Sequence, residues 1–261
     1  MFPFFFGSSD RPLFGAHSPP AKSARDTAIV LVPPLGQEAL RAHRAIRQLG
    51  LRLARDRFHT LRFDLGGTGD SAGDFADARL QAWVEDTRTA IDELRDRTGV
   101  ARVSLVGLRL GAALAWLAAQ DRKDIDKIVL WEPVVRGASY LVELRRRHEE
   151  FLRAELPRRR TAPFAKDGEA LGFPISRELA DAVRAIDLTK GPSPNARCAV
   201  ALVTAEGEDE RAFEAALPSL VPRSRFSRLP VSQSWDSDEA VNSSLVPSEA
   251  IDAIIATLGE K

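Results

Sequence analysis

One arginine stands in a stretch of small residues where a strand is expected to end and a helix to begin. Residues 103–111 read VSLVGLRLG, so Gly107 and Gly111 lie two residues on either side of Arg109. Glycines at this spacing allow a sharp strand-to-helix turn, because no Cβ obstructs the approach of the two elements. The turn places Arg109 at a helix amino terminus, where free backbone N–H groups favour anions. The side chain itself is no nucleophile, since a guanidinium stays protonated at ordinary pH.

The elements around this turn follow a regular alternation. Short apolar runs predict strands at 28–34, 58–65, 103–108 and 127–133, and helical spacing predicts helices at 38–56, 78–98 and 110–120. Two earlier strands are expected on either side of a turn at 7–10. Strands that alternate with helices predict a mainly parallel sheet with helices on both faces.

The alternation stops after Pro133. Residues 136–192 are charged and helix-prone, and we predict a helical cap insertion there. The sheet pattern resumes at 196–206 and continues through a short helix near 209–217, a strand at 224–232 and a final helix after Pro247. We therefore expect a core formed by residues 1–135 and 193–261, with the cap between its two parts.

Three motifs together resemble the α/β-hydrolase superfamily. The segment 107–111 is similar to the Gly-x-Ser-x-Gly nucleophile elbow, with Arg109 in place of the serine. The segment 64–71, DLGGTGDS, resembles a loop of esterases and serine aminopeptidase-like hydrolases. The segment 32–37, VPPLGQ, resembles the loop that donates an oxyanion-hole N–H. The resemblance covers nearly the whole chain and implies an α/β-hydrolase fold. Within the superfamily, GLRLGA is similar to the elbow of exosortase A system-associated hydrolases.

The resemblance also implies positions for an acid and a histidine. The acid should follow the strand at 196–206, where Glu206, Glu208 and Asp209 are available. The histidine should lie within 232–247, which contains none. The positions that depart from the catalytic pattern are Arg109, Glu206, Glu208, Trp235 and Asp236. We expect no standard catalytic residue, because the nucleophile and its proton acceptor are both missing.

Other residues offer weaker candidates for chemistry. Of the four histidines, His148 in the cap and His43 in the first helix could approach the site, although surface or capping roles fit them better. His17 and His59 are expected at strands. Among the hydroxyls, Ser71 suits a polar loop and Ser104 a core strand; these two serines are the remaining candidate nucleophiles.

Arg109 has two interpretations. In the first, its guanidinium and the backbone of Leu35, Gly36 and Leu110 bind an anion. In the second, which we favour, Arg109 pairs internally with a carboxylate, because an unpartnered buried guanidinium would cost several kcal/mol. The candidate partners are Glu206, Glu208, Asp209, Asp236 and Asp238.

The amino-acid composition limits the classes of function that remain. Lys+Arg and Asp+Glu are both 37, which argues against a nucleic-acid-binding protein. A single cysteine and four histidines make a zinc site improbable, and we expect no metal or cofactor. The apolar start, MFPFFFG, is too short for a membrane span or a secretory signal, which favours a soluble cytoplasmic protein. Residues 4–6, all phenylalanine, are expected to cover the edge strand or to contact a second copy in a homodimer.

These patterns leave three interpretations of function. The leading one is a catalytically degenerate hydrolase homologue that binds a small anionic ligand or a protein partner. Arginines at 145–147 and 158–160 suit a solvated surface, or attraction of such an anion. The resemblance implies a supporting role in bacterial exopolysaccharide or surface-protein export. The alternatives are an esterase, thioesterase or acyl transferase with a rearranged site that includes His148 or an acid, and a purely structural subunit.

Overall fold

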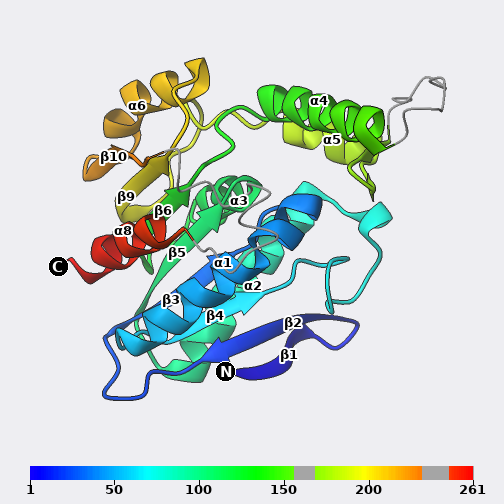
Figure 1. The fold of residues 1–261 in the computed structure, drawn as a ribbon. Coiled ribbons are helices and arrows are strands. Elements are labelled where there is room, and N and C mark those ends of the chain that lie inside the picture. Colours follow the sequence, from blue (N-terminus) through cyan, green and yellow to red (C-terminus); the bar gives the residue numbers. More distant parts are fainter. Residues whose placement is uncertain (156–167, 231–246, 261) are drawn as a thin grey trace.

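A computed structural model describes residues 1–155, 168–230 and 247–260 (Figure 1). Its main sheet has eight strands in the order β1-β2-β4-β3-β5-β6-β9-β10. The first two strands form an antiparallel hairpin, and β2 also pairs antiparallel with β4. The remaining neighbours are parallel. The bounds are β1 Phe2–Ser8, β2 Arg11–Ser18, β3 Thr27–Val32, β4 Thr60–Phe63, β5 Arg102–Leu108, β6 Ile125–Trp131, β9 Ala196–Val203 and β10 Ser224–Arg228.

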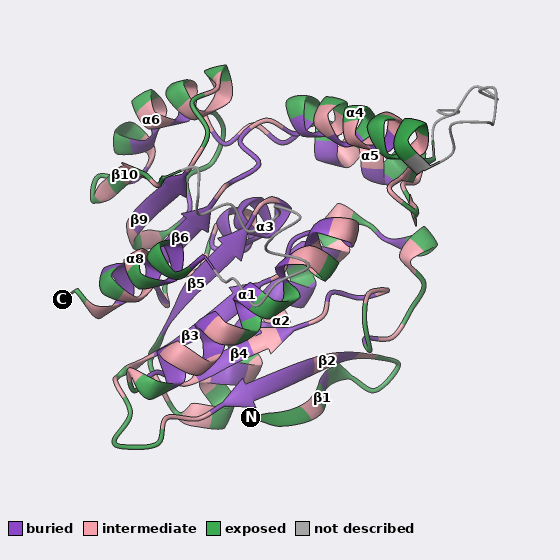
Figure 2. Ribbon diagram, in the orientation of Figure 1, coloured by how far each residue is buried: buried purple, intermediate pink, exposed green. Residues whose placement is uncertain are grey.

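Helices cover both faces of this sheet, as the apolar runs of the strands require. On one face, α1 (Gly36–Arg55) and α8 (Ser248–Gly259) pack on a cluster that includes Ile29 and Val129. On the other, α2 (Leu80–Thr98), α3 (Leu110–Ala118) and α6 (Glu208–Leu220) contribute to the larger core. Figure 2 shows β5, β6 and much of β9 as buried. The prediction of a mainly parallel sheet flanked by helices is confirmed.

Several predicted boundaries shift by a few residues. The strand predicted at 58–65 is shorter, because β4 ends at Phe63 and the glycine-rich loop follows directly. The segment 224–232 pairs only from Ser224 to Arg228, and its last two residues lie outside the described ranges. A 3-10 turn, η1 (Phe75–Asp77), connects the glycine-rich loop to α2.

Between β6 and β9 the described residues form two helices and a short hairpin, which we call the helical segment. It contains α4 (Gly137–Glu155), a short hairpin of β7 (Glu169–Ala170) and β8 (Phe173–Pro174), and α5 (Arg177–Arg184). The side chain of Ser176 accepts a hydrogen bond from Leu179 N–H and so caps α5. In Figure 1 α4 and α5 lie beyond the upper end of the sheet. The division into core and cap at residues 135/136 and 192/193 remains a prediction.

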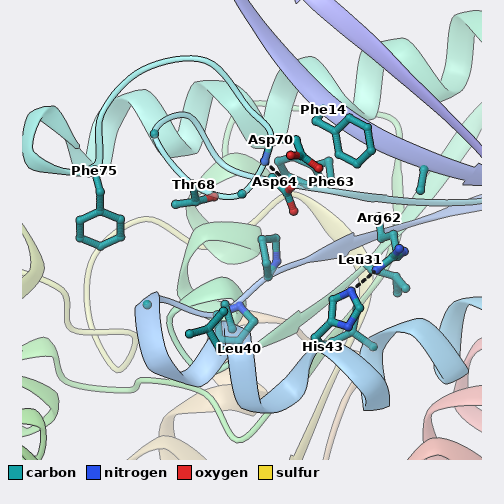
Figure 3. A pocket seen from close by; sticks show the side chains of 18 of the residues that line it. Phe14, Leu31, Leu40, His43, Arg62, Phe63, Asp64, Thr68, Asp70 and Phe75 are labelled. Carbon is teal, nitrogen blue, oxygen red and sulfur yellow. Dashed lines mark hydrogen bonds between the residues drawn. The ribbon is translucent and has the colours of Figure 1, made fainter. Parts of the chain in front are cut away.

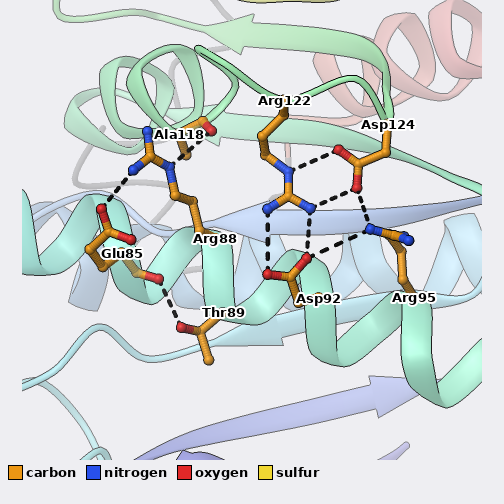
Figure 4. A network of polar contacts seen from close by, with 8 residues as sticks. All are labelled: Glu85, Arg88, Thr89, Asp92, Arg95, Ala118, Arg122 and Asp124. Atoms are coloured by element: carbon orange, nitrogen blue, oxygen red, sulfur yellow. Dashed lines mark hydrogen bonds and ion pairs between the residues drawn. The ribbon is translucent and has the colours of Figure 1, made fainter.

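A network of ion pairs joins α2 to the loop before β6 (Figure 4). Arg122 lies at its centre, 2.6 Å from an oxygen of Asp92 and 2.6 Å from one of Asp124. Arg95 contacts the same Asp124 at 2.7 Å. Burial opposes the charge of Asp124, but the hydrogen bonds from Arg122 and the charges of Arg122 and Arg95 together outweigh it and lower the pKa of this carboxyl. The network therefore holds α2 and the start of β6 in a fixed relation.

Candidate functional site

The predicted elbow is a strained strand-to-helix turn. Arg109 lies between β5 and α3 with φ 54° and ψ −120°, a conformation that non-glycine residues rarely adopt. An ideal Cβ on Gly107 would lie 2.3 Å from the carbonyl oxygen of Gly111. One on Gly111 would lie 2.4 Å from the carbonyl oxygens of Val32 and Pro33. Close packing of the turn against itself and against the end of β3 thus requires both glycines.

The side chain of Arg109 is bound by two carboxylates. Its Nε donates to Glu38 Oε1 at 2.9 Å, and its Nη2 donates to Glu143 Oε2 at 2.6 Å. The second oxygen of Glu38 accepts a hydrogen bond from the Tyr140 hydroxyl at 2.8 Å. Arg147 contacts Glu143 at 2.8 Å. We call these five residues the Arg109 cluster; its two arginines balance its two glutamates.

Burial makes this cluster electrostatically demanding. The Arg109 side chain is 15% exposed and that of Glu38 only 3%. Burial alone would lower the pKa of Arg109, but attraction to Glu38 and Glu143 outweighs it and raises this pKa above its ordinary value. Burial raises the pKa of Glu38, which Arg109 and the Tyr140 hydroxyl oppose. Arg109 is therefore a permanent cation and cannot act as a base.

The internal pairing of Arg109 is confirmed, but its carboxylates are Glu38 and Glu143, and the three predicted partners that the structure describes pair with other arginines. Glu208 and Asp209 both contact Arg136, at 3.5 and 2.8 Å, and Glu206 contacts Arg228 at 3.7 Å. These two arginines form ion pairs with the carboxylates around the start of α6, whereas Arg109 forms ion pairs with glutamates of α1 and α4. The other two predicted partners, Asp236 and Asp238, lie outside the described residues, as does Trp235, a position that departs from the catalytic pattern.

Sequence reasoning missed the true partners, although α1 carried a signal. Its buried residues include Ala42, Ile46, Leu49 and Leu53. Glu38 lies four residues before Ala42 and therefore on the same buried face. A carboxylate on an otherwise apolar helix face requires a cation within reach. Glu143 has no comparable signal, because α4 carries charges on most sides.

The predicted backbone contributors lie beside the cluster. Leu35 is extended and directly precedes α1, and Gly36 has φ 54°. An ideal Cβ on Gly36 would lie 3.1 Å from the Phe173 ring, so the loop packs tightly under the β7–β8 hairpin. Leu110 is buried at the start of α3. A ligand-binding role for Leu35, Gly36 and Leu110 remains a prediction.

The alternative nucleophiles and bases have structural partners. His148 Nδ1 accepts a hydrogen bond from Leu171 N–H at 3.0 Å and so supports the β7–β8 turn. Ser71 donates to the Asp64 carbonyl at 2.6 Å. The hydroxyl of Ser104 accepts from Lys127 N–H at 3.3 Å. These contacts give each residue a role in the fold.

A cavity of about 460 Å³ borders Arg109, between α4 and the amino end of α6. Its charged lining residues are Arg109, Arg136, Glu143, Glu208, Asp209 and Glu210. Carboxylates outnumber guanidinium groups here by four to two, which weighs against a small anionic ligand at this position. Within the described ranges, no three His, Cys, Asp or Glu side chains are placed to hold a metal ion. In the same ranges, no helix is long and apolar enough to cross a membrane.

Comparisons with solved structures agree with the fold. Est1E from Butyrivibrio proteoclasticus, solved with ferulic acid, is 16% identical, with a TM-score of 0.66 over 98% of this chain and 100% of that one. An esterase of Pyrococcus furiosus, Pf2001, is 14% identical, with a TM-score of 0.64 over 98% and 89%. A putative hydrolase from Agrobacterium vitis S4 is 20% identical, with a TM-score of 0.59 over 98% and 97%. Among curated proteins no match was found.

At such identities the solved structures establish the fold alone. A family model described as serine aminopeptidase, S33, matches residues 24–205 and so includes all three motifs. The resemblance to α/β-hydrolases is thereby confirmed, whereas the resemblance to exosortase A system-associated hydrolases remains a prediction. With its elbow, sheet and helical layers in place, the chain belongs to the serine aminopeptidase S33 family of the α/β-hydrolase fold.

Proposed function

We propose that this chain is a non-hydrolytic member of its family that acts by binding a ligand or partner. The observation that carries the proposal is the double ion pair of Arg109 with Glu38 and Glu143 at the nucleophile position. A serine hydrolase needs a free hydroxyl at this position and a histidine to take its proton. Here a cation fills the position, and two carboxylates hold it there.

The alternative of an active hydrolase requires a nucleophile elsewhere. Ser71 and Ser104 bond to backbone groups, and His148 Nδ1 is occupied by Leu171 N–H. No contact among the described residues joins one of these serines to a histidine as a nucleophile–base pair. This absence supports the binding role over a rearranged catalytic site. A cytoplasmic location and a role in bacterial export remain hypotheses that derive from sequence and resemblance.

The first test is chemical. Purified protein should hydrolyse p-nitrophenyl acetate no faster than heat-denatured protein, and a fluorophosphonate probe should leave it unlabelled. Arg109→Ser should remain inactive as well, because triad members act as a unit and residues 232–247 contain no histidine.

The opposite result would be saturable hydrolysis by the unmodified protein that His148→Gln abolishes. That outcome would establish the rearranged-site enzyme and overturn the binding proposal. Arg146→Ser is the matched control for Arg109→Ser, since Arg146 is exposed on α4 and lies outside the Arg109 cluster.

A further inference from the structure

The sheet ends in a strand whose outer edge is unpaired. β1 is the first strand in the sheet order and, among the described strands, pairs with β2 alone. Its sequence, FPFFFGS, holds no charged side chain. Edge strands usually carry charged residues, prolines or a bulge that block pairing with a further strand. Of these devices β1 has Pro3 alone, and Figure 2 shows much of the strand as exposed.

Two hydrogen bonds of β2 determine which backbone groups of β1 face outward. Phe14 N–H donates to Ser71 Oγ at 2.8 Å, and the Phe14 carbonyl oxygen accepts from Asp64 N–H at 2.9 Å. Both backbone groups of Phe14 therefore point away from β1. Phe5 lies opposite Phe14 in the register, so these two residues form a pair without hydrogen bonds between them. The N–H and the carbonyl of Phe5 consequently point to the outer edge of the sheet.

The outer edge of β1 is complementary to itself about a twofold axis. Every second residue presents its backbone there, so Pro3, Phe5 and Gly7 form one row. In an antiparallel pair centred on Phe5, each Phe5 N–H donates to the Phe5 carbonyl of the other copy. Gly7 N–H then donates to the Pro3 carbonyl of the other copy. Pro3 has no N–H, and its ring lies opposite Gly7, which has no side chain to obstruct it.

Phe5 also provides an exposed aromatic surface on the α1 side of the sheet. Its ring contacts that of Phe14, with 5.5 Å between the centroids, yet Phe5 is 61% exposed. Phe14 itself lines a cavity of about 670 Å³, across from α1 (Figure 3). A second Phe5 beside this aromatic pair would bury apolar surface that is exposed in the single chain.

The opposite face of β1 lies against α2 and has its charge compensated. Phe6 is buried there in the larger core, and the guanidinium of Arg97 lies 3.8 Å from the centroid of the Phe4 ring. Arg97 forms an ion pair with Glu93 at 2.6 Å. Like charges directly opposite each other destabilise a strand pair. Two copies of β1 would meet without such a pair, because the strand has no charge and the cation beside it is neutralised.

We propose that β1 is the interface of a homodimer, in which two copies of the strand pair antiparallel about Phe5 and the sheet continues from one copy into the other. A second copy fits this edge because both copies present the same row of donors and acceptors, with Pro3 opposite Gly7. One strand and few side chains make a small interface, of the class that buries less than about 1,200 Å² in total. We therefore expect a reversible dimer with a dissociation constant of about 10 µM. The interface does not depend on the binding role proposed above.

Sedimentation velocity tests the dimer. The unmodified protein should be mainly dimeric at about 200 µM and monomeric at about 1 µM. Phe5→Lys should weaken association at least about tenfold, because two like charges would face each other at the axis. Phe151→Lys changes an exposed phenylalanine of α4 and should leave association unchanged. A monomer at every concentration, or an equally stable dimer in Phe5→Lys, overturns the proposal.

Cysteine cross-linking tests the register, after Cys198→Ser has removed the native thiol. Phe5→Cys would place two thiols opposite each other, with Cα atoms about 5.5 Å apart, which suits a disulfide. Phe2→Cys changes a similarly exposed residue of β1, but its two copies would lie roughly 20 Å apart. Mild oxidation should therefore give a covalent dimer from Phe5→Cys alone. Equal yields from the two variants, or none from Phe5→Cys, overturn the proposed pairing. Because Phe5→Cys adds no charge, it also tests the interface if Phe5→Lys fails to fold.

Discussion

At the scale of single residues, arginine at the elbow reverses what the position requires of its neighbours. A serine there needs a histidine that can accept a proton, whereas Arg109 needs carboxylates that compensate a buried charge. Glu38 and Glu143 meet that need, and the Tyr140 hydroxyl satisfies the remaining oxygen of Glu38. The chemistry of the position has changed from proton transfer to charge compensation.

Replacement of Arg109 should destabilise the folded protein. In Arg109→Met, Glu38 would keep a buried carboxylate without its cation, so we expect the free energy of unfolding to fall by roughly 3–5 kcal/mol. Urea unfolding at neutral pH measures the change. Arg146→Met, which breaks an exposed pair with Glu150, should cost no more than about 0.5 kcal/mol. A loss of similar size in the two variants would contradict the prediction.

At the scale of elements, the sequence predicted those features of the fold that local residue patterns determine. Alternating apolar runs and helical spacing located the strands and helices, and the spacing of Gly107 and Gly111 located the elbow. The partners of Arg109 depended instead on where a long side chain points and on how α4 lies over the sheet. Such contacts join residues distant in sequence, and nothing local distinguishes Glu143 from its charged neighbours. The buried face of α1 would have identified Glu38.

The antiparallel part of the sheet should make stability sensitive to acid. His17 Nε2 lies 3.0 Å from His59 Nδ1, and burial, together with the neighbouring His59, lowers the pKa of His17 to about 4. The unfolded chain therefore binds a proton that the folded chain resists. This contribution to stability is present above about pH 6.5 and is lost as the pH falls towards 4.

Replacement of His17 tests that contribution. The melting temperature of the unmodified protein should fall between pH 7 and pH 4.5, and His17→Gln should show a shallower decrease, because the titrating group is gone. Differential scanning calorimetry across this range measures both slopes. Carboxylates that titrate in the same window are common to the two proteins and cancel in the comparison. Parallel slopes would show that His17 does not titrate differently on folding.

At the scale of the whole molecule, charged contacts join the helical segment that contains α4 and α5 to the rest of the fold. Glu143 of α4 and Glu38 of α1 share Arg109. Near the start of the segment, Arg136 pairs with Asp209 of α6. A Cβ on Gly137 would lie 1.7 Å from the Val183 carbonyl oxygen, so α4 and α5 pack in close contact there. Movement of this segment would therefore expose or separate buried charges.

Replacement of Glu143 by a neutral residue should loosen the helical segment at α4. In Glu143→Gln one carboxylate contact of Arg109 is lost, and we expect amide hydrogens of α4 to exchange about tenfold faster, which corresponds to about 1.4 kcal/mol of local opening. Hydrogen exchange followed by mass spectrometry resolves this effect, with peptides from β5 and β6 as an internal reference. Glu149→Gln on the same helix, whose contact with Arg153 is exposed, is the matched variant and should leave exchange unchanged. Equal rates in the two variants would exclude a holding role for Glu143.

The backbone at Arg109 has a consequence for how readily this chain could change its chemistry over evolutionary time. Its conformation and its two flanking glycines already have the form of a nucleophile elbow. A serine introduced there would need no rearrangement of the main chain, only release of the two glutamates. A histidine after the last strand would have to arise by a separate substitution. The glycines follow from the packing of the turn, so the residue between them, and not the glycines, decides whether such an elbow carries a nucleophile.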